Sequence, residues 1–288
     1  MTLQQLLTQA VGRLEENSVP NAEYDARFLL FEVFNLDFAR FLSVRDQELS
    51  KDEKTGGLCS RFIELIEKRA SRIPLQQLTG TQGFMGLEFK VNEHVLIPRQ
   101  DTEILVELVL KEQKDREKTV LDVCTGSGCI AVSLAALGGY KQVTALDISK
   151  EALRVTEENA GRLLGEYKGS FRILESDMFS GLEHEAAFDV IVSNPPYIPT
   201  EVIEGLEPEV RDFEPRLALD GTEDGLFFYR VLAAQCREHL KPGGCVYMEI
   251  GSEQSEAVQA LFAGQGYKDI RTIKDLAGFD RVVRAALI

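Results

Sequence analysis

The feature that most constrains the fold is an alternation of strand-like and helix-like segments that begins at Thr119. Short apolar runs predict strands, and longer segments with helical spacing predict the helices between them. The expected strands cover residues 119–123, 143–147, 171–175, 188–193, 245–250, 268–273 and 281–285, and the expected helices lie near residues 128–137, 150–164, 225–240 and 252–263. The first, second and fourth strands are nearly continuous apolar runs, as expected when both faces of a sheet are covered. This pattern predicts a doubly wound α/β domain with a seven-stranded, mostly parallel sheet.

The first 80 residues follow a helical pattern instead. Apolar residues recur with helical spacing from Leu3 to Leu14, from Tyr24 to Phe34 and from Leu58 to Arg69. Pro74 is expected to end the last of these helices near Ile73, because proline cannot continue a helix. Residues 1–80 are therefore predicted to form a small helical bundle.

Residues 81–97 are expected to link the bundle to the α/β domain. Short β-type runs around Gly83 and Gly86 predict a β-hairpin here. Residues 98–288 then form the α/β domain. It is expected to open with a helix from about Asp101 to Lys114, with Asp101 or Thr102 as the N-cap.

Composition narrows the functional classes. The 288 residues include 47 acidic and 32 basic side chains, a formal net charge of −15. This excess disfavours a protein whose main affinity comes from neutralising nucleic-acid phosphates, although it leaves room for a pocket that accepts one base. No apolar run approaches the roughly 18 residues that span a bilayer, and the N-terminus does not resemble a signal peptide. The five scattered cysteines form no C-x-x-C pair, so we expect reduced thiols, a cytoplasmic location and no metal site.

A turn rich in glycine follows the first strand of the α/β domain. Its residues are Cys124-Thr125-Gly126-Ser127-Gly128, and glycines in such a turn let the backbone approach a ligand closely. Asp147 ends the second strand, 21 residues after Gly126, where a carboxylate can accept hydrogen bonds from both ribose hydroxyls. The spacing is not that of a dinucleotide site and no phosphate-binding lysine follows, so S-adenosylmethionine fits better than a pyrophosphate cofactor. A tight turn without any ligand is the alternative.

Asp177 and Met178 follow the third strand of the same domain. The carboxyl ends of strands line the ligand crevice of an open α/β sheet. Asp177 could therefore accept a hydrogen bond from an adenine amino group, with Met178 packed on the ring. An aspartate that only caps a turn is an equally open interpretation.

The fourth strand runs directly into Asn194-Pro195-Pro196-Tyr197. Two prolines stiffen the backbone and remove two donors, which leaves carbonyl groups free to accept hydrogen bonds. Asn194 adds a side-chain acceptor and Tyr197 a flat aromatic face, so the loop is suited to hold a planar group that carries an NH₂. The three histidines, His94, His184 and His239, lie outside these motifs and are expected to be structural or on the surface. A rigid polyproline turn that merely ends the strand is the alternative for the loop.

With these motifs, the chain resembles the S-adenosylmethionine-dependent amino methyltransferases that carry Asn-Pro-Pro-Tyr. It is most similar to the HemK/PrmC-type glutamine methyltransferases of peptide-chain release factors. Similarity extends to Ile97–Glu103, Phe213–Leu219 and Asp275–Arg281. The resemblance implies a Rossmann-like class I methyltransferase domain, S-adenosyl-L-methionine as donor and S-adenosyl-L-homocysteine as product. It also implies methylation of the side-chain amide nitrogen of the glutamine in the Gly-Gly-Gln motif of bacterial class I release factors.

The resemblance also implies a role for each motif residue. The turn formed by Cys124, Thr125, Gly126, Ser127 and Gly128 would hold the methionine part of the cofactor, although Cys124 stands where the family usually has glycine. Asp147 would bind the ribose, Asp177 and Met178 would border the adenine, and Asn194 would also lie beside the cofactor. The substrate-binding residues would be Asn194, Pro195, Pro196 and Tyr197, and the catalytic residues among them would be Asn194, Pro195 and Tyr197.

The motifs leave open one other enzymatic function and one function without catalysis. The same loop could hold a flipped adenine or guanine, as in a nucleic-acid amino methyltransferase. Residues 201–225 carry nine acidic and two basic side chains, which would repel a phosphate backbone and could instead face a basic protein surface. A binding module without catalysis is less consistent with an intact Asn194–Tyr197 loop. We therefore expect release factors as partners, no direct nucleic-acid or membrane partner, and a monomer whose residues 1–80 recognise the substrate protein.

Overall fold

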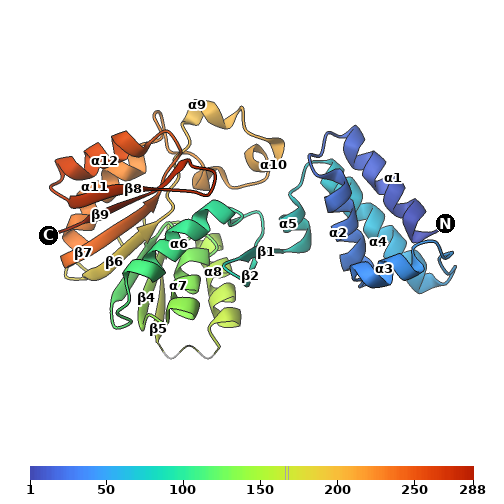
Figure 1. Cartoon of the computed structure of the whole chain (residues 1–288), viewed down its shortest axis with the longest axis horizontal. Coiled ribbons are helices and arrows are strands. Elements are labelled where there is room, and N and C mark those ends of the chain that lie inside the picture. Colours follow the sequence, from blue (N-terminus) through green and yellow to red (C-terminus); the bar gives the residue numbers. More distant parts are fainter. Residues whose placement is uncertain (166, 168) are drawn as a thin grey trace. The chain divides into compact units, whose positions relative to one another are not determined.

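The computed structural model describes residues 1–165, 167 and 169–288, and these residues divide into two compact units (Figure 1). The first unit comprises Met1–Gly80 together with Pro208–Phe213. The second comprises Thr81–Glu207 and Glu214–Ile288. A short segment from the second half of the chain therefore folds with the N-terminal helices.

The first unit is helical in the part that the structure describes. Its helices are α1 (Leu3–Glu16), α2 (Ala22–Phe34), α3 (Phe38–Val44), α4 (Glu53–Ala70), α5 (Leu75–Thr79) and α10 (Pro208–Arg211). At the start of α1, Thr2 and Gln5 form a reciprocal capping box, which satisfies two backbone donors. The third predicted helix, α4, ends at Ala70, earlier than expected, and Pro74 precedes α5 instead of ending α4.

A buried ion cluster ties the segment Pro208–Phe213 to the other helices of the first unit. Arg69, which is 5% exposed, donates to Asp25 at 2.7 Å and to Glu209 at 2.8 Å. Arg72 also donates to Glu209, at 2.7 Å from Nε. Because buried charges are tolerated only when they are paired and hydrogen-bonded, Glu209 is a specific anchor for this segment.

The second unit opens with the predicted hairpin, β1 (Thr81–Phe84) and β2 (Leu87–Lys90), which pair antiparallel. The two turn residues, Met85 and Gly86, both have positive φ, which suits the twist of a two-residue hairpin turn. Asn159 of α8 (Lys150–Leu163) accepts from the Lys90 backbone N–H at 2.7 Å and donates to the Lys90 carbonyl at 3.0 Å. The hairpin is thus fixed to the second unit.

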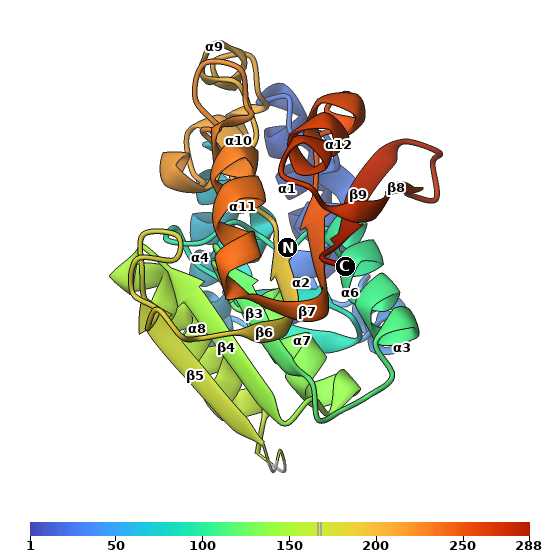
Figure 2. The same ribbon diagram turned by 90° about the vertical axis from the view of Figure 1, so that its left-hand side faces the viewer.

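The central sheet has seven strands in the order β5-β4-β3-β6-β7-β9-β8, and only β9 runs antiparallel to its neighbours (Figure 2). The chain first adds strands on one side of β3 and then returns to add β6 on the other side, so the strand order reverses between β3 and β6. Ligands bind in such folds at the carboxyl ends of the strands beside this reversal. The strands are β3 (Thr119–Val123), β4 (Gln142–Asp147), β5 (Ser170–Glu175), β6 (Phe188–Ser193), β7 (Leu240–Glu249), β8 (Lys268–Lys274) and β9 (Asp280–Ala286).

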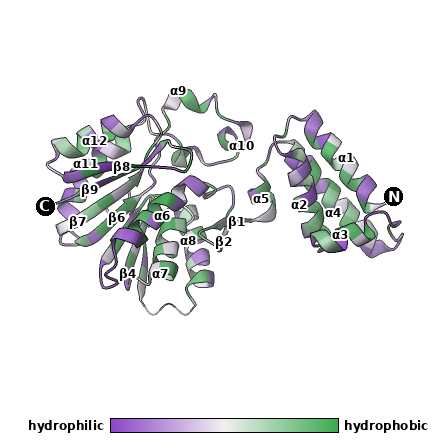
Figure 3. Cartoon of the chain, in the orientation of Figure 1, coloured by the Kyte–Doolittle hydropathy of each residue, from purple (hydrophilic) through white to green (hydrophobic). Residues whose placement is uncertain are grey.

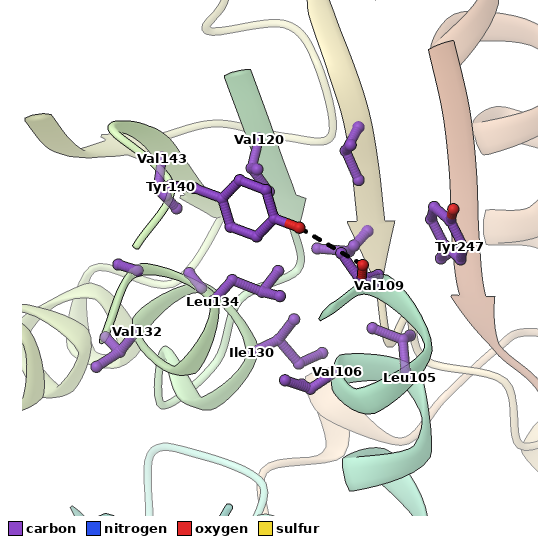
Figure 4. Close-up of a cluster of buried hydrophobic side chains, with 14 of the residues drawn as sticks. Leu105, Val106, Val109, Val120, Ile130, Val132, Leu134, Tyr140, Val143 and Tyr247 are labelled. Atoms are coloured by element: carbon purple, nitrogen blue, oxygen red, sulfur yellow. Dashed lines mark hydrogen bonds between the residues drawn. The ribbon is translucent and has the colours of Figure 1, made fainter. Parts of the chain in front are cut away.

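Helices cover both faces of this sheet, which explains the apolar runs of the strands. Alternate residues belong to different cores: Val120 packs with residues of α6 (Gln100–Glu112) and α7 (Cys129–Gly138), whereas Leu121 packs with residues of α11 (Phe227–His239) and α12 (Ser255–Gly264). Figure 3 shows the hydrophobic colouring of α7 and the central strands, and Figure 4 shows the first of these cores. In that core the hydroxyl of Tyr140 donates to the carbonyl of Val109 at 3.5 Å. The remaining helices are the short α9 (Thr200–Ile203) and a 3₁₀ turn at Arg216–Ala218.

The structure confirms the predicted fold class and corrects some boundaries. Each predicted strand and helix of the α/β domain is present within a few residues of its expected position, although β7 begins at Leu240. The predicted N-cap of α6 is wrong, because Arg99 precedes the helix and both Asp101 and Thr102 lie in its first turn. Asp101 pairs with Arg281 at 3.2 Å instead, and Thr102 is buried. Among the residues described, no helix combines the length and hydrophobicity needed to traverse a bilayer.

Candidate functional site

A cavity of about 700 Å³ lies at the carboxyl ends of β3, β4, β5 and β6 in the second unit. Four separate motifs reach it. Nine of the predicted site residues line its wall: Cys124, Thr125, Gly126, Ser127, Asp147, Asp177, Met178, Asn194 and Pro196. The strand reversal between β3 and β6 therefore brings together residues that lie up to 72 positions apart in the sequence.

Three predicted site residues, all within the described part of the chain, do not line this cavity: Gly128, Pro195 and Tyr197. Gly128 is the N-cap residue of α7. Pro195 is buried, and Tyr197 packs against the core on the side of α11 and α12. The Tyr197 hydroxyl donates to Glu249 at 3.3 Å.

The glycine turn has two glycines with different physical roles. Gly126 has φ +57°, and a Cβ added there would meet no atom within 4 Å, so this side of the backbone is open at the cavity. Gly128 has φ +79°, and a Cβ there would lie 2.8 Å from Cγ2 of Thr156. The first glycine leaves room for a ligand, whereas the second allows α7 and α8 to pack closely.

Asp147 holds the turn and still has acceptor capacity. Its Oδ2 accepts from the Gly126 N–H at 2.8 Å, and its Oδ1 accepts from the Ser149 N–H at 2.9 Å. Burial raises the pKa of Asp147, and the backbone hydrogen bonds partly offset that rise. A carboxylate has about four lone-pair sites, so each oxygen can accept one further hydrogen bond. This arrangement fits a vicinal diol such as a ribose.

Cys124 adopts the left-handed backbone conformation that its neighbours adopt with glycine. Its φ is +62°, and Met178 on the facing segment has φ +52°. The two sulfur atoms lie 3.9 Å apart at the cavity wall. Burial raises the pKa of the Cys124 thiol, so the residue is a neutral packing group and not a nucleophile. Cys124 thus adopts a backbone conformation for which glycine is suited.

We expect Cys124→Gly to change the free energy of unfolding by less than about 1 kcal/mol, because relief of backbone strain offsets lost packing and a more flexible unfolded chain. Cys124→Val should destabilise the protein by at least about 2 kcal/mol, because a β-branched residue tolerates positive φ poorly. Urea unfolding of both variants measures the difference. A valine variant as stable as the glycine variant would contradict the assigned strain.

Asp122 is a fully buried acid beneath the turn and lies outside the predicted motifs. Its Oδ2 accepts from the Thr125 hydroxyl at 2.6 Å and from the Ala131 N–H at 3.2 Å. Its Oδ1 has no hydrogen-bond partner among the described residues, and burial raises its pKa to about 7. The sequence feature that could have indicated Asp122 is the presence of an acidic residue inside an otherwise apolar strand.

The Asn194–Tyr197 loop is held from several sides. The Ser193 hydroxyl donates to the Val123 carbonyl at 2.7 Å, and Gln254 donates to the Tyr197 carbonyl at 2.9 Å. The Asn194 side-chain nitrogen donates to the Thr102 hydroxyl at 3.4 Å. With the nitrogen engaged, the Asn194 amide oxygen is the acceptor that the side chain offers at the cavity.

Ion pairs join the other motifs to this site. Glu214, a buried carboxylate, accepts from the Ile97 N–H at 3.2 Å and from Arg99 at 2.7 Å. Arg281 pairs with Asp101 and, at 3.0 Å, with Asp275. The segment Ile97–Glu103 is therefore connected both to Phe213–Leu219 and to Asp275–Arg281.

Two histidines, His94 and His239, line the cavity although they lie outside the predicted motifs. His239 is buried, stacks on Phe179 with ring centroids 5.3 Å apart, and shares a hydrogen bond with the Ala186 carbonyl at 2.9 Å. His94 is exposed. The position of His239 in the wall was not foreseen because it depends on the packing of α11 against the segment after β5.

Comparison with known proteins identifies the relatives of this chain. Residues 5–80 match the PrmC N-terminal domain, and residues 99–204 match the methyltransferase small domain. The chain is 44% identical over 283 residues to the release factor glutamine methyltransferase of Moorella thermoacetica, covering 98% of this chain and 97% of the relative. It is 41% identical over 282 residues to the protein of the same name from Geobacter sulfurreducens, covering 98% and 95%. A methyltransferase structure from Pyrococcus furiosus shares the fold, with a TM-score of 0.52, 20% identity, and coverage of 76% of this chain and 98% of that one.

Proposed function

Because the chain belongs to the release factor glutamine methyltransferase family, we propose that it methylates the glutamine of the Gly-Gly-Gln motif in class I release factors with S-adenosyl-L-methionine as donor. The enzyme is a protein-glutamine N5-methyltransferase, so the acceptor is the side-chain amide nitrogen. The observation that carries the proposal is the cavity at which a glycine turn, an acid suited to ribose and the Asn194 acceptor meet.

The cofactor side of the cavity fits S-adenosylmethionine. When bound, this cofactor supplies an electrophilic methyl group on a positively charged sulfur. The open backbone at Gly126 suits its amino-acid part, and Asp147 has two free acceptor positions for the ribose hydroxyls. Asp177 is exposed and Met178 is buried beside it, which suits the polar edge and the flat face of adenine. The acids Asp147 and Asp177, which line the cavity, also favour a cation there.

The substrate side has to orient a poor nucleophile. An amide nitrogen shares its lone pair with the carbonyl, as the rotation barrier of about 18–20 kcal/mol indicates. The Asn194 oxygen and the Pro195 carbonyl would accept the two N–H groups, which orients the nitrogen and increases its electron density. Such positioning can contribute about 7–11 kcal/mol, and no strong base is needed because the proton can leave after the new N–C bond forms. Tyr197, whose hydroxyl donates to Glu249, would pack its ring against the plane of the substrate amide.

Charge favours a protein substrate over the alternative of a nucleic acid. Residues 201–225 carry nine acidic and two basic side chains immediately after the substrate loop. Glu209 and the buried Glu214 are paired with arginines outside the segment, so they do not add to its surface charge. Glu201 and Glu223 are exposed, and Arg216 is shared between Glu204 at 3.4 Å and Asp220 at 3.3 Å. A negative surface beside the loop repels nucleic-acid phosphates and attracts basic protein surfaces.

The direct test offers both substrates together. The protein is incubated with methyl-labelled S-adenosylmethionine, a class I release factor and ribosomal RNA, and the labelled residue is located by mass spectrometry. We expect label on the glutamine side chain of the Gly-Gly-Gln motif and none on a factor that has glutamate at that position. Label in RNA alone would support the nucleic-acid alternative and contradict the proposal.

The helical unit would recognise the body of the release factor. Tyr24 and Phe28 of α2 are 54% and 39% exposed and lie with ring centroids 6.0 Å apart, which is suitable for an apolar contact. We expect the double variant Tyr24→Ser, Phe28→Ser to raise KM for the whole release factor about tenfold and to leave KM for a short Gly-Gly-Gln peptide unchanged. Leu276→Ser, at an exposed apolar residue of the second unit, is the control. Equal effects on factor and peptide would contradict a recognition role.

A further inference from the structure

Glu249 carries a buried carboxyl group beside the substrate loop. It is the last residue of β7 and 2% exposed. Strands β6 and β7 pair in parallel with Ser193 opposite Met248, so Glu249 lies level with the first residue of the Asn194–Tyr197 loop. Its Oε1 accepts from the Tyr197 hydroxyl at 3.3 Å, and its Oε2 has no hydrogen-bond partner among the described residues.

Thr102 connects Glu249 to Asn194. The Thr102 side chain on α6 is buried and accepts from the Asn194 side-chain nitrogen at 3.4 Å. It also lies close enough to the Glu249 carboxyl group to lower the pKa of that group, although no hydrogen bond joins these two side chains, both of which the structure describes. A hydroxyl has one hydrogen to donate. If that hydrogen points to a Glu249 carboxylate, Thr102 can only accept from Asn194. The charge of Glu249 would therefore favour one end of the Asn194 amide at Thr102 over the other.

We infer that Glu249 is a positioning residue whose carboxylate directs these hydrogen bonds and so keeps the Asn194 oxygen turned toward the substrate amide. The inference rests on the proposed function of the loop. The oxygen and nitrogen ends of an amide have nearly the same shape, so only hydrogen-bond partners distinguish them. A protonated Glu249 can donate to Thr102, which frees the Thr102 hydrogen for the Asn194 oxygen. The reversed Asn194 then presents N–H groups to the N–H groups of the substrate.

The groups around Glu249 come from four elements and the substrate loop. Arg281 of β9 and Asp101 of α6 form an ion pair nearby, and Tyr197 belongs to the loop. Tyr229 of α11 donates its hydroxyl to the Glu249 backbone carbonyl at 2.9 Å, and Cys129 of α7 is close enough to be affected by the charge of Glu249. Arg281 is shared with Asp101 and Asp275, so no cation is dedicated to Glu249.

Burial raises the pKa of Glu249 from 4.5 to about 7, although Thr102, Arg281 and Tyr197 oppose the rise and Asp101 adds to it. The carboxylate therefore forms as the pH rises through about 7, and methyl transfer should increase over the same range. Stability should change in the opposite direction. The native state binds a proton that the unfolded state has released, so the free energy of unfolding falls between pH 4.5 and about 7.

The test compares four single variants of the full-length protein over this pH range, with kcat and KM measured on a Gly-Gly-Gln peptide. We expect Glu249→Gln to lower kcat about 10- to 100-fold and to abolish its rise with pH, because the glutamine NH₂ competes as a donor. Thr102→Val should behave in the same way, whereas Thr102→Ser should retain most of the activity. Tyr229→Phe, which removes a contact to the backbone of Glu249 but not to its carboxylate, is the control and should keep the pH profile.

A second readout does not depend on activity. Carbon-13 NMR titration of the glutamate carboxyl groups, assigned by Glu249→Gln, should show Glu249 ionising near pH 7. If Glu249 ionises near 4.5, or if Glu249→Gln keeps the wild-type kcat and pH profile, the inference is wrong. If Glu249→Gln does not fold, equal activity of Thr102→Val and Thr102→Ser overturns the inference instead. Failure of the wild-type protein to methylate the peptide would contradict the proposed function, which is a separate outcome.

Discussion

Replacing Asn194 by alanine is expected to lower kcat for methyl transfer at least about 100-fold, comparable to the loss of one well-placed hydrogen-bonding group in other active sites. The variant removes the side-chain oxygen that would accept a substrate N–H, while the rest of the wall of the cavity remains. Cofactor affinity should stay within about threefold, because the glycine turn and Asp147 would supply most of the cofactor contacts. Single-turnover rates and calorimetry with S-adenosylhomocysteine measure the two effects separately.

Thr200→Ala is a suitable control for the Asn194 variant. Thr200 lies a few residues after the substrate loop, and its hydroxyl donates to Asp220 at 2.6 Å instead of facing the cavity. Its loss should leave kcat close to the wild-type value. An Asn194→Ala variant with wild-type kcat would show that the loop does not act through its side-chain acceptor.

Replacing Asp147 by alanine should weaken cofactor binding at least about 100-fold. Hydrogen bonds to a charged group each contribute about 1.5–3 kcal/mol, and the variant would lose two of them to the ribose. The Gly126 N–H would lose its carboxylate partner as well, so the turn would be less well held. Calorimetric titration with S-adenosylmethionine and S-adenosylhomocysteine gives the change in Kd directly.

Asp189 offers a matched control at the opposite end of the sheet. Its Oδ2 accepts from the Thr119 N–H at 2.8 Å and from Lys241 at 2.7 Å, a comparable set of contacts far from the strand ends that line the cavity. Asp189→Ala should lower stability without changing the Kd of the folded protein. If Asp147→Ala binds the cofactor as tightly as Asp189→Ala does, Asp147 is not a ribose ligand.

The strands and helices that could be predicted are those that a local sequence pattern specifies. Buried parallel strands require long apolar runs, so β3, β4 and β6 were recognisable from their residues alone. The short helices α3, α9 and α10 were not predicted, because helices of this length are stabilised mainly by tertiary contacts. The N-cap of α6 was assigned wrongly for the same reason: Asp101 is engaged by Arg281, which lies far away in the sequence.

The site residues that could be predicted are those in motifs at the carboxyl ends of predicted strands. The turn at Gly126, Asp147 and the loop at Asn194 all follow parallel strands, and such ends meet at one edge of the sheet. Asp122 and Glu249 were not selected, because their importance depends on which groups surround a buried acid. The part played by Thr102 depends likewise on its contact with Asn194 across 92 positions of the sequence.

The most direct measurement of the central claim is a crystal structure of the protein with S-adenosylhomocysteine and a peptide that contains Gly-Gly-Gln. We expect the glutamine amide nitrogen within hydrogen-bonding distance of the Asn194 side-chain oxygen and the Pro195 carbonyl, with the cofactor ribose on Asp147. A glutamine side chain bound away from residues 194–197, or a cofactor bound away from the turn at 124–128, would contradict it.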